Sequence, residues 1–227
     1  MLLLLAVLPG VVLFAAVRKQ DKIEKEPAGL LWKLFIGGAL TTVSAIVLGR
    51  LGGEFVTGLV DEDSLAFLLI DNFIITALVE EGGKYFVLKR ATWKHPAFNY
   101  TFDAIVYAVT ASLGFAVLEN ILYVVDSDLE TALLRAVLSV PGHAFDGVYM
   151  GYFYGLAKSA QTAGSPRVTR KNLRRALWTP VLLHGFYDFC LETESTVFLI
   201  IFFAFDLALT VFAVRRIKTS SRTDAPV

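Results

Sequence analysis

Three ionisable side chains interrupt a stretch of the chain that is otherwise suited to lipid. Glu80 and Glu81 are adjacent, and Lys84 follows within one helical turn, with apolar runs on both sides. A charged side chain at the centre of a bilayer costs roughly 2.5–3.5 kcal/mol on insertion scales, so ionisable residues in membrane spans usually serve a function. Lys84 can partly neutralise either carboxylate, at i+4 from Glu80 or i+3 from Glu81. We interpret the pair as catalytic or transport carboxylates rather than as a structural ion pair.

Two histidines occur in a second pattern that could carry chemistry. His143 and Asp146 are three residues apart, and His184 and Asp188 are four apart, so each pair lies on one face of a helix. Each aspartate could orient its imidazole through a hydrogen bond. The remaining histidine, His95, adjoins a proline in a loop and is interpreted as a solvated surface residue.

A further apolar segment adds Glu119 to this set. At a rise of 1.5 Å per residue, Glu80, Glu119, His143 and His184 lie roughly 10–15 Å below the outer ends of their segments. Four helices therefore bring a carboxylate or an imidazole to a similar depth, in the outer half of the bilayer. We expect these side chains to meet in one pocket.

Two hydrolytic mechanisms are open to such a pocket. Two histidines and a carboxylate can hold Zn²⁺ with a free coordination position, while another glutamate takes a proton from water. Without metal, a glutamate could activate water alone, with histidine and asparagine stabilising the oxyanion. The His-Glu-x-x-His helix of many zinc enzymes is absent, and spacing does not separate the two routes. Glu81 is favoured as the general base, because Lys84 lies a full turn from Glu80 and can pair with it.

The elements that must position these residues are membrane-spanning helices. The chain has 227 residues, of which 56% are hydrophobic, and soluble domains are usually about 45–50% apolar. We predict an all-α, polytopic integral membrane protein in the cell membrane, a single domain over residues 1–227 with its catalytic helices at about 64–191. About seven spans are expected, near residues 1–17, 30–48, 64–90, 102–125, 132–156, 177–191 and 197–214, with Ser64 capping the third and Pro141-Gly142 interrupting the fifth.

Charge distribution predicts the orientation of these spans. Lys and Arg gather after the first, third, fifth and seventh spans, whereas the other connections are acidic or nearly free of basic residues. The positive-inside rule places the N-terminus outside and the C-terminus in the cytoplasm. The formal net charge is zero, which gives no reason to expect a nucleic-acid partner. The single cysteine, Cys190, excludes an intramolecular disulfide.

Several motifs in a fixed order resemble the PrsW intramembrane proteases. The resemblance covers most of the chain and includes a charged loop at residues 21–27. The motifs are Glu80-Glu81-x-x-Lys84, Asp103 to Tyr107, Gly114-Phe115-Ala116-x-x-Glu119-Asn120, Gly142-His143-Ala144 and His184-Gly185-x-x-Asp188. The family is similar to the wider group of CAAX-processing and Abi membrane proteases. In that group a histidine stands where this chain has Glu119, so the group's mechanism does not transfer directly.

The resemblance implies an intramembrane endopeptidase that makes the first cut in a membrane-anchored, anti-sigma-factor-like protein, on the outer side. The implied substrate is a single-pass membrane protein within the lipid bilayer. The implied active site consists of Glu80, Glu81, Glu119, His143 and His184. Zinc would be held by Glu119, His143 and His184, and the supporting residues would be Lys84, Asp103, Asn120, Asp146 and Asp188.

Two other classes of function fit the same residues. Histidines and carboxylates in spans also mark proton or divalent-cation pathways, so a transporter or channel is the alternative. The absence of inverted repeats in the sequence argues against a transporter. A binding scaffold without activity is the third hypothesis, and the full set of acids and histidines speaks against it.

Overall fold

The computed structural model describes residues 2–125 and 127–227. Over this part of the chain the helices form seven rods, two of which contain an internal π-helical segment. The bounds are α1 (Leu2–Gln20), α2 (Ala28–Thr57), α3 (Leu65–Ile70), η1 (Asp71–Ala77), α4 (Leu78–Thr92), α5 (Asp103–Val125), α6 (Leu129–Leu134), η2 (Arg135–Ser139), α7 (Val140–Thr162), α8 (Pro166–Glu192) and α9 (Thr196–Arg222). The all-helical class predicted from the sequence is confirmed.

Four of these helices, α1, α2, α5 and α9, are long and apolar enough to cross a membrane. Helix α5 is the central one, with 78% of its most apolar window buried, against 17% for α1 and for α9. The outer helices thus expose apolar faces, as lipid surroundings require. The rods that contain α4, α7 and α8 carry the paired glutamates and the two histidines predicted to react. The count of seven spans, the orientation and the single domain stay predictions.

Local sequence explains where the helices begin. Ser64 accepts a hydrogen bond from the N–H of Phe67 at 3.1 Å and caps α3, as expected, and Asp128 caps α6 through the N–H of Thr131 at 2.8 Å. Proline stands directly before α2 at residue 27 and at the first position of α8 at residue 166. A proline is tolerated there because the first helical N–H groups have no partner within the helix.

The predicted interruption at Pro141-Gly142 is not a break in the helix. The chain continues as one rod from α6 through η2 into α7. The N–H of Val140 donates to the carbonyl of Arg135, which closes a π-helical turn directly before Pro141. Because proline lacks an N–H, the wider turn accommodates it without ending the rod.

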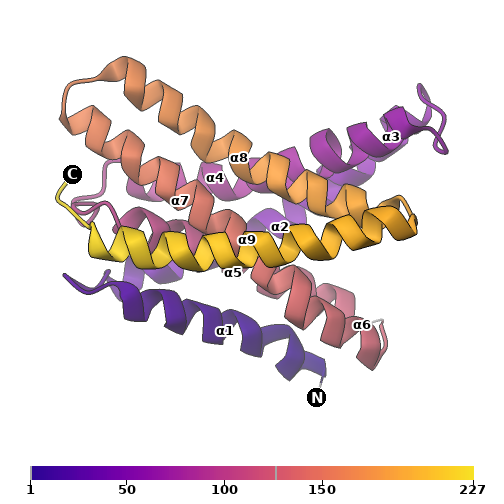
Figure 1. Ribbon diagram of the computed structural model, residues 1–227, viewed down its shortest axis with the longest axis horizontal. Helices are drawn as coiled ribbons and strands as arrows, with labels where there is room; N and C mark the ends of the chain where they lie inside the picture. The colour runs from indigo at the N-terminus through magenta and orange to yellow at the C-terminus, as the bar shows by residue number, and fades with distance from the viewer. Residues whose placement is uncertain (1, 126) are drawn as a thin grey trace.

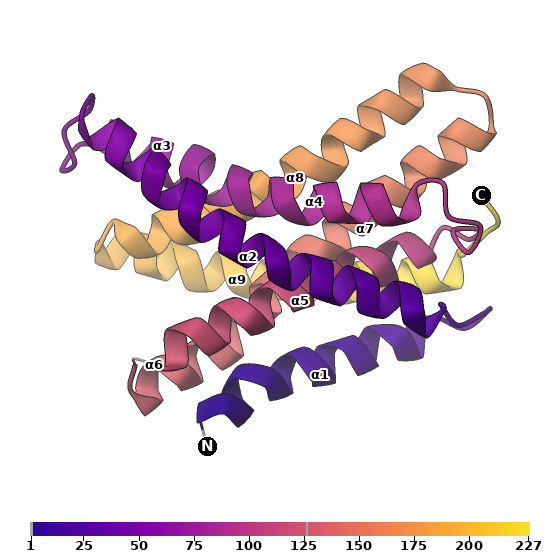
Figure 2. The ribbon, with the colours of Figure 1, turned by 180° about the vertical axis from the view of Figure 1, so that it is seen from behind.

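Glycine permits the close approach of α2 to α5, which Figure 2 shows crossing at the back of the bundle. A Cβ added at Gly38 would lie 1.9 Å from the carbonyl oxygen of Ala111, and one at Gly114 would lie 2.0 Å from that of Phe35. Small residues at such crossings are typical of helix packing in membranes. The two glycines therefore fix how closely α5 is held against α2.

Replacing Gly38 by alanine is expected to destabilise the protein by about 1–3 kcal/mol, the usual cost of overpacking a core. Gly49→Ala in the same helix is the matched control, because a Cβ there meets nothing within 4 Å. Thermal unfolding of both variants in detergent measures the difference. Equal melting temperatures for the two variants would contradict the described crossing of α2 and α5.

Candidate active site

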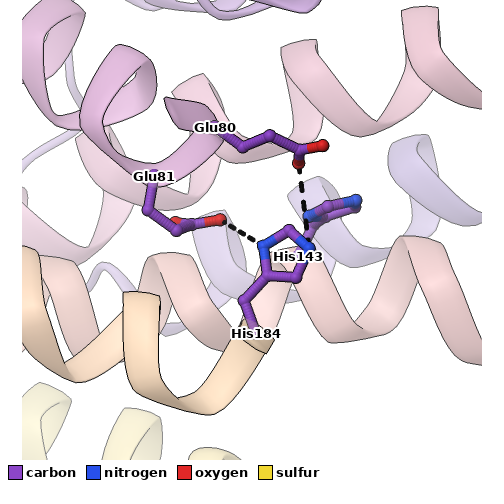
Figure 3. Close-up of side chains that lie close together, drawn as sticks. All are labelled: Glu80, Glu81, His143 and His184. Atoms are coloured by element: carbon purple, nitrogen blue, oxygen red, sulfur yellow. Dashed lines mark hydrogen bonds and ion pairs between the residues drawn. The ribbon is translucent and has the colours of Figure 1, made fainter. Parts of the chain in front are cut away.

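Side chains from three helices meet within the bundle, and we call them the His–Glu cluster: Glu80 and Glu81 of α4, His143 of α7 and His184 of α8. Figure 3 shows both glutamates directed at His184, with His143 beside it. One ligand atom from each of the four residues lies within 4.8 Å of all the others. All four are buried, and Glu81 is fully inaccessible. The structure thus brings together acids and imidazoles that lie far apart in the sequence.

The backbone next to the cluster has unusual local structure. Segment η1 ends directly before α4 and its two glutamates, and η2 ends shortly before His143. Single π-helical turns often occur at functional sites, because they rotate the residues that follow. On α8, Gly185 lies against Phe73 of η1, and a Cβ there would be 2.5 Å from the ring. The glycine next to His184 therefore allows α8 to approach η1.

Lys84 pairs more closely with Glu81 than with Glu80. Its Nζ lies 2.6 Å from Glu81 Oε1 and 3.6 Å from Glu80 Oε2, and it also contacts His143 Nδ1 at 3.0 Å. The expected preference of Lys84 for Glu80 is therefore wrong. Both spacings suit a helix, and the position of His143 draws the ammonium toward Glu81. Glu81 was favoured as the base because Lys84 was expected to pair with Glu80, so that reason no longer holds.

Each imidazole of the cluster is held from behind by another carboxylate. His143 Nε2 lies 3.1 Å from Glu119 Oε2, and its Nδ1 faces Lys84. His184 Nε2 lies 3.0 Å from Asp188 Oδ2, and its Nδ1 lies 3.0 Å from Glu81 Oε1. Carboxylates in this position fix the orientation of metal-binding histidines. The expected contact between His184 and Asp188 is present.

Arg135 is a residue of the site that the sequence did not indicate. Its Nη2 lies 2.7 Å from Glu119 Oε2, and its Nε donates to Asn120 Oδ1 at 3.0 Å. The guanidinium also lies 3.8 Å from the ring centre of Tyr123. Asn120 thus reaches the site through Arg135, and its supporting role stays a prediction. The sequence feature that could have identified Arg135 is the presence of an arginine inside the apolar run before Pro141.

Two predicted supporting residues do not act as expected. Asp103 lies at the start of α5, where its Oδ2 accepts the N–H groups of Asn99 at 3.0 Å and Tyr100 at 2.7 Å, so the structure does not bring it to the His–Glu cluster. Asp146 does line the cavity. Among the described residues, however, its Oδ1 has no hydrogen-bond partner and no bond joins it to His143.

A cavity of about 440 Å³ opens beside the cluster. It is lined by Glu80, Glu119, His143, His184 and Asp188 but not by Glu81, and leucines of η2 and α8 complete its wall. It extends toward Asn72 and Glu192, near the acidic connection that follows α8. Water in this cavity would therefore reach Glu80 rather than Glu81.

The cluster has the properties of a metal site. Two imidazoles and two carboxylates form a donor set that suits zinc. Glu80 Oε2 and Glu81 Oε2 are buried and lack a hydrogen-bond donor among the described residues. Glu119, expected as a ligand, lies outside the group of four and is engaged by Arg135. The residues present thus fit a bound cation, with Glu119 supporting His143.

Arg135→Gln is expected to lower cleavage activity by about 10–100-fold, because the groups that orient metal-binding residues typically contribute that much. The effect should fall on kcat, since Arg135 holds Glu119 and through it His143. Arg135→Lys keeps the charge but not the planar fork, so partial rescue is expected. Arg167→Gln, at an exposed position of α8, is the control. A change in KM alone would contradict the positioning role.

Comparison with known proteins agrees with the geometry. The family model described as "PrsW family intramembrane metalloprotease" matches residues 26–214. A protein named Protease PrsW from Oceanobacillus iheyensis is 37% identical over 94% of this chain and 93% of its own length. Proteins of that name from Halalkalibacterium halodurans and Bacillus subtilis are each 34% identical, over 98% and 82% of this chain and 98% and 81% of their own lengths. No solved structure matches the chain.

Proposed function

Because the chain belongs to the PrsW family of intramembrane metalloproteases, we propose that the His–Glu cluster is its catalytic metal centre. The chain is a multi-pass membrane protease, and membership of this family leaves no need for the transporter hypothesis. The observation that carries the proposal is the convergence of four ligand atoms within 4.8 Å beside a cavity. If these residues had lain on separate faces of the bundle, the proposal of a metal centre would have had no support.

We propose zinc as the metal, with Glu81, His143 and His184 as its ligands. Two nitrogens and one carboxylate oxygen are a common zinc set that leaves a position open for chemistry. Glu119 and Asp188 would support the two imidazoles from their outer nitrogens, at the distances given above. Lys84 Nζ lies 2.6 Å from Glu81 Oε1, whose charge it balances, and 3.0 Å from His143 Nδ1, from which it would move aside when the metal binds.

Glu80 is the proposed general base. It lines the cavity, and it lies farther from Lys84 than Glu81 does. A bound metal would supply a Lewis acid for the scissile carbonyl. Glu80 would take a proton from the attacking water and return it to the leaving amine, as a positioned carboxylate can. Its remaining contact is with His184 Nε2, at 3.8 Å.

The proposed substrate is a membrane-anchored protein with a single span, of the anti-sigma-factor type. The cavity extends toward the acidic connections, which the positive-inside rule places outside. Its leucine-rich wall would accept apolar side chains that flank the scissile bond. We therefore propose cleavage near the outer membrane face.

A cleavage assay tests this function. Purified protein in liposomes is incubated with a single-pass substrate, with and without 1,10-phenanthroline, and the products are mapped by mass spectrometry. The expected result is one cut near the outer boundary, lost with the chelator and restored by zinc. Chelator-resistant cleavage would overturn the metal centre, and the absence of cleavage for several single-pass substrates would overturn the proposed substrate class.

A further inference from the structure

A second group of acidic side chains lies at the opposite end of the bundle from the cavity mouth. Glu24 and Glu26 belong to the connection between α1 and α2, and Asp103 is the first residue of α5. One carboxylate oxygen from each lies within 4.8 Å of the others. We call these residues the three-carboxylate group. Glu24 is exposed, whereas Glu26 is 3% exposed and Asp103 is fully buried.

Each buried carboxylate of this group is satisfied at one oxygen only. Asp103 Oδ2 accepts two backbone N–H groups, and Glu26 Oε2 accepts the hydroxyl of Tyr107. The other oxygens, Asp103 Oδ1 and Glu26 Oε1, are buried without a hydrogen-bond partner among the described residues. Carboxylates held at one oxygen and free at the other are typical of metal ligands.

Side-chain cations do not neutralise this charge. The nearby Lys25 directs its Nζ to the backbone carbonyls of Arg18, at 2.7 Å, and Asp21. Within the described ranges no ion pair reaches the three carboxylates. Asp21 adds another buried carboxylate, with both oxygens unpartnered. Buried charge without a partner is costly.

Burial, together with the charge of Asp103, raises the pKa of Glu26 to about 8, although the hydrogen bond from Tyr107 opposes the shift. Burial is the largest cause, and a hydrogen bond with Asp103 adds to the shift. A bound cation would take the place of the proton that this pKa keeps on Glu26 at neutral pH.

We propose that the three-carboxylate group binds a hard divalent cation, Mg²⁺ or Ca²⁺. The donors are all oxygens, which these ions prefer and which suit zinc less well than the His–Glu cluster does. The ion would join the connection after α1 to the start of α5. The C-terminal tail lies at the same end of the bundle (Figure 1), where Asp224 accepts hydrogen bonds at 2.8 Å from Thr101 and from the N–H of Phe102. The ion would therefore stabilise a junction of three chain segments, separate from the catalytic cluster.

Terbium luminescence tests this proposal on the full-length, zinc-loaded protein in detergent. Tb³⁺ replaces hard divalent ions, and Tyr107, bonded to Glu26, would sensitise its emission. We expect saturable emission that Ca²⁺ or Mg²⁺ displaces, and the stronger competitor identifies the ion. Glu26→Gln is expected to weaken Tb³⁺ binding by at least about tenfold. Asp61→Asn, in an exposed loop, should bind as the unmodified protein does.

A second variant tests the proposal even if the buried substitution Glu26→Gln prevents folding. Glu24→Gln changes an exposed member of the group and leaves the hydrogen bonds of Glu26 and Asp103 in place. It should retain the melting temperature of the ion-free protein and lose the increase that Mg²⁺ or Ca²⁺ produces. Emission unaffected by both substitutions, or no ion-dependent change in melting temperature between pH 6 and 9, would overturn the proposal.

Discussion

Glu80→Gln is expected to lower kcat by about 10²–10⁴-fold, the usual contribution of a positioned general base. Glutamine keeps the length of the side chain but cannot accept a proton from water. The residue lines the cavity and is not a proposed ligand, so bound zinc should stay equimolar with the chain. Cleavage rate and zinc content are measured on the same preparation, with Glu62→Gln in an exposed loop as the control.

Glu81→Gln separates the roles of the two adjacent acids. The substitution removes the negative charge that lies 2.6 Å from the fully buried Lys84 and leaves only Glu80, at 3.6 Å, to balance the ammonium. This variant is therefore expected to lose zinc and to melt at a lower temperature, whereas Glu80→Gln should do neither. An active Glu80→Gln enzyme, together with an inactive Glu81→Gln enzyme that retains zinc, would reverse the assignment.

His184→Ala is expected to weaken zinc binding by more than about 100-fold, the upper range for residues that merely support a ligand. The substitution removes the nitrogen that lies 3.0 Å from Glu81 and leaves Asp188 without its partner. Competition with a chromogenic zinc chelator measures the affinity without any cleavage assay. His95→Ala is the control, because that imidazole accepts only the N–H of Ala97 in a loop.

Asp188→Asn provides an intermediate step in the same series. It preserves the proposed ligand His184 and weakens only the contact behind it, so a loss of about 10–100-fold is expected. An unchanged zinc affinity in His184→Ala would remove His184 from the metal site and contradict the proposed ligand set.

The sequence predicted the helices and the convergence of the reactive residues because both follow from simple periodicity. Apolar length gave the rods, and a common depth along them brought Glu80, His143 and His184 to one level. The proposed relation to the CAAX-processing and Abi group stays a prediction from the same motifs. The predictions of the helices and of their common depth need only the rise of a helix and the cost of placing charge in lipid.

The positions of the other residues depend on contacts that periodicity does not encode. Asp103 was grouped with Glu119 because one apolar segment carries both, yet sixteen residues of helix separate them by about 24 Å. Lys84 pairs with Glu81 where it also contacts His143, a residue of another helix. Arg135 was overlooked because its partner Glu119 belongs to a different rod. Tertiary neighbours, not spacing, determine these roles.

Zinc K-edge X-ray absorption on purified, active protein tests the central claim most directly. We expect zinc bound by two imidazoles and carboxylate oxygen, with Zn–N distances of about 2.0–2.1 Å. In His184→Ala the signature should fall to one imidazole. Active protein without zinc, or zinc whose surroundings are identical in the variant, would contradict a metal centre at the His–Glu cluster.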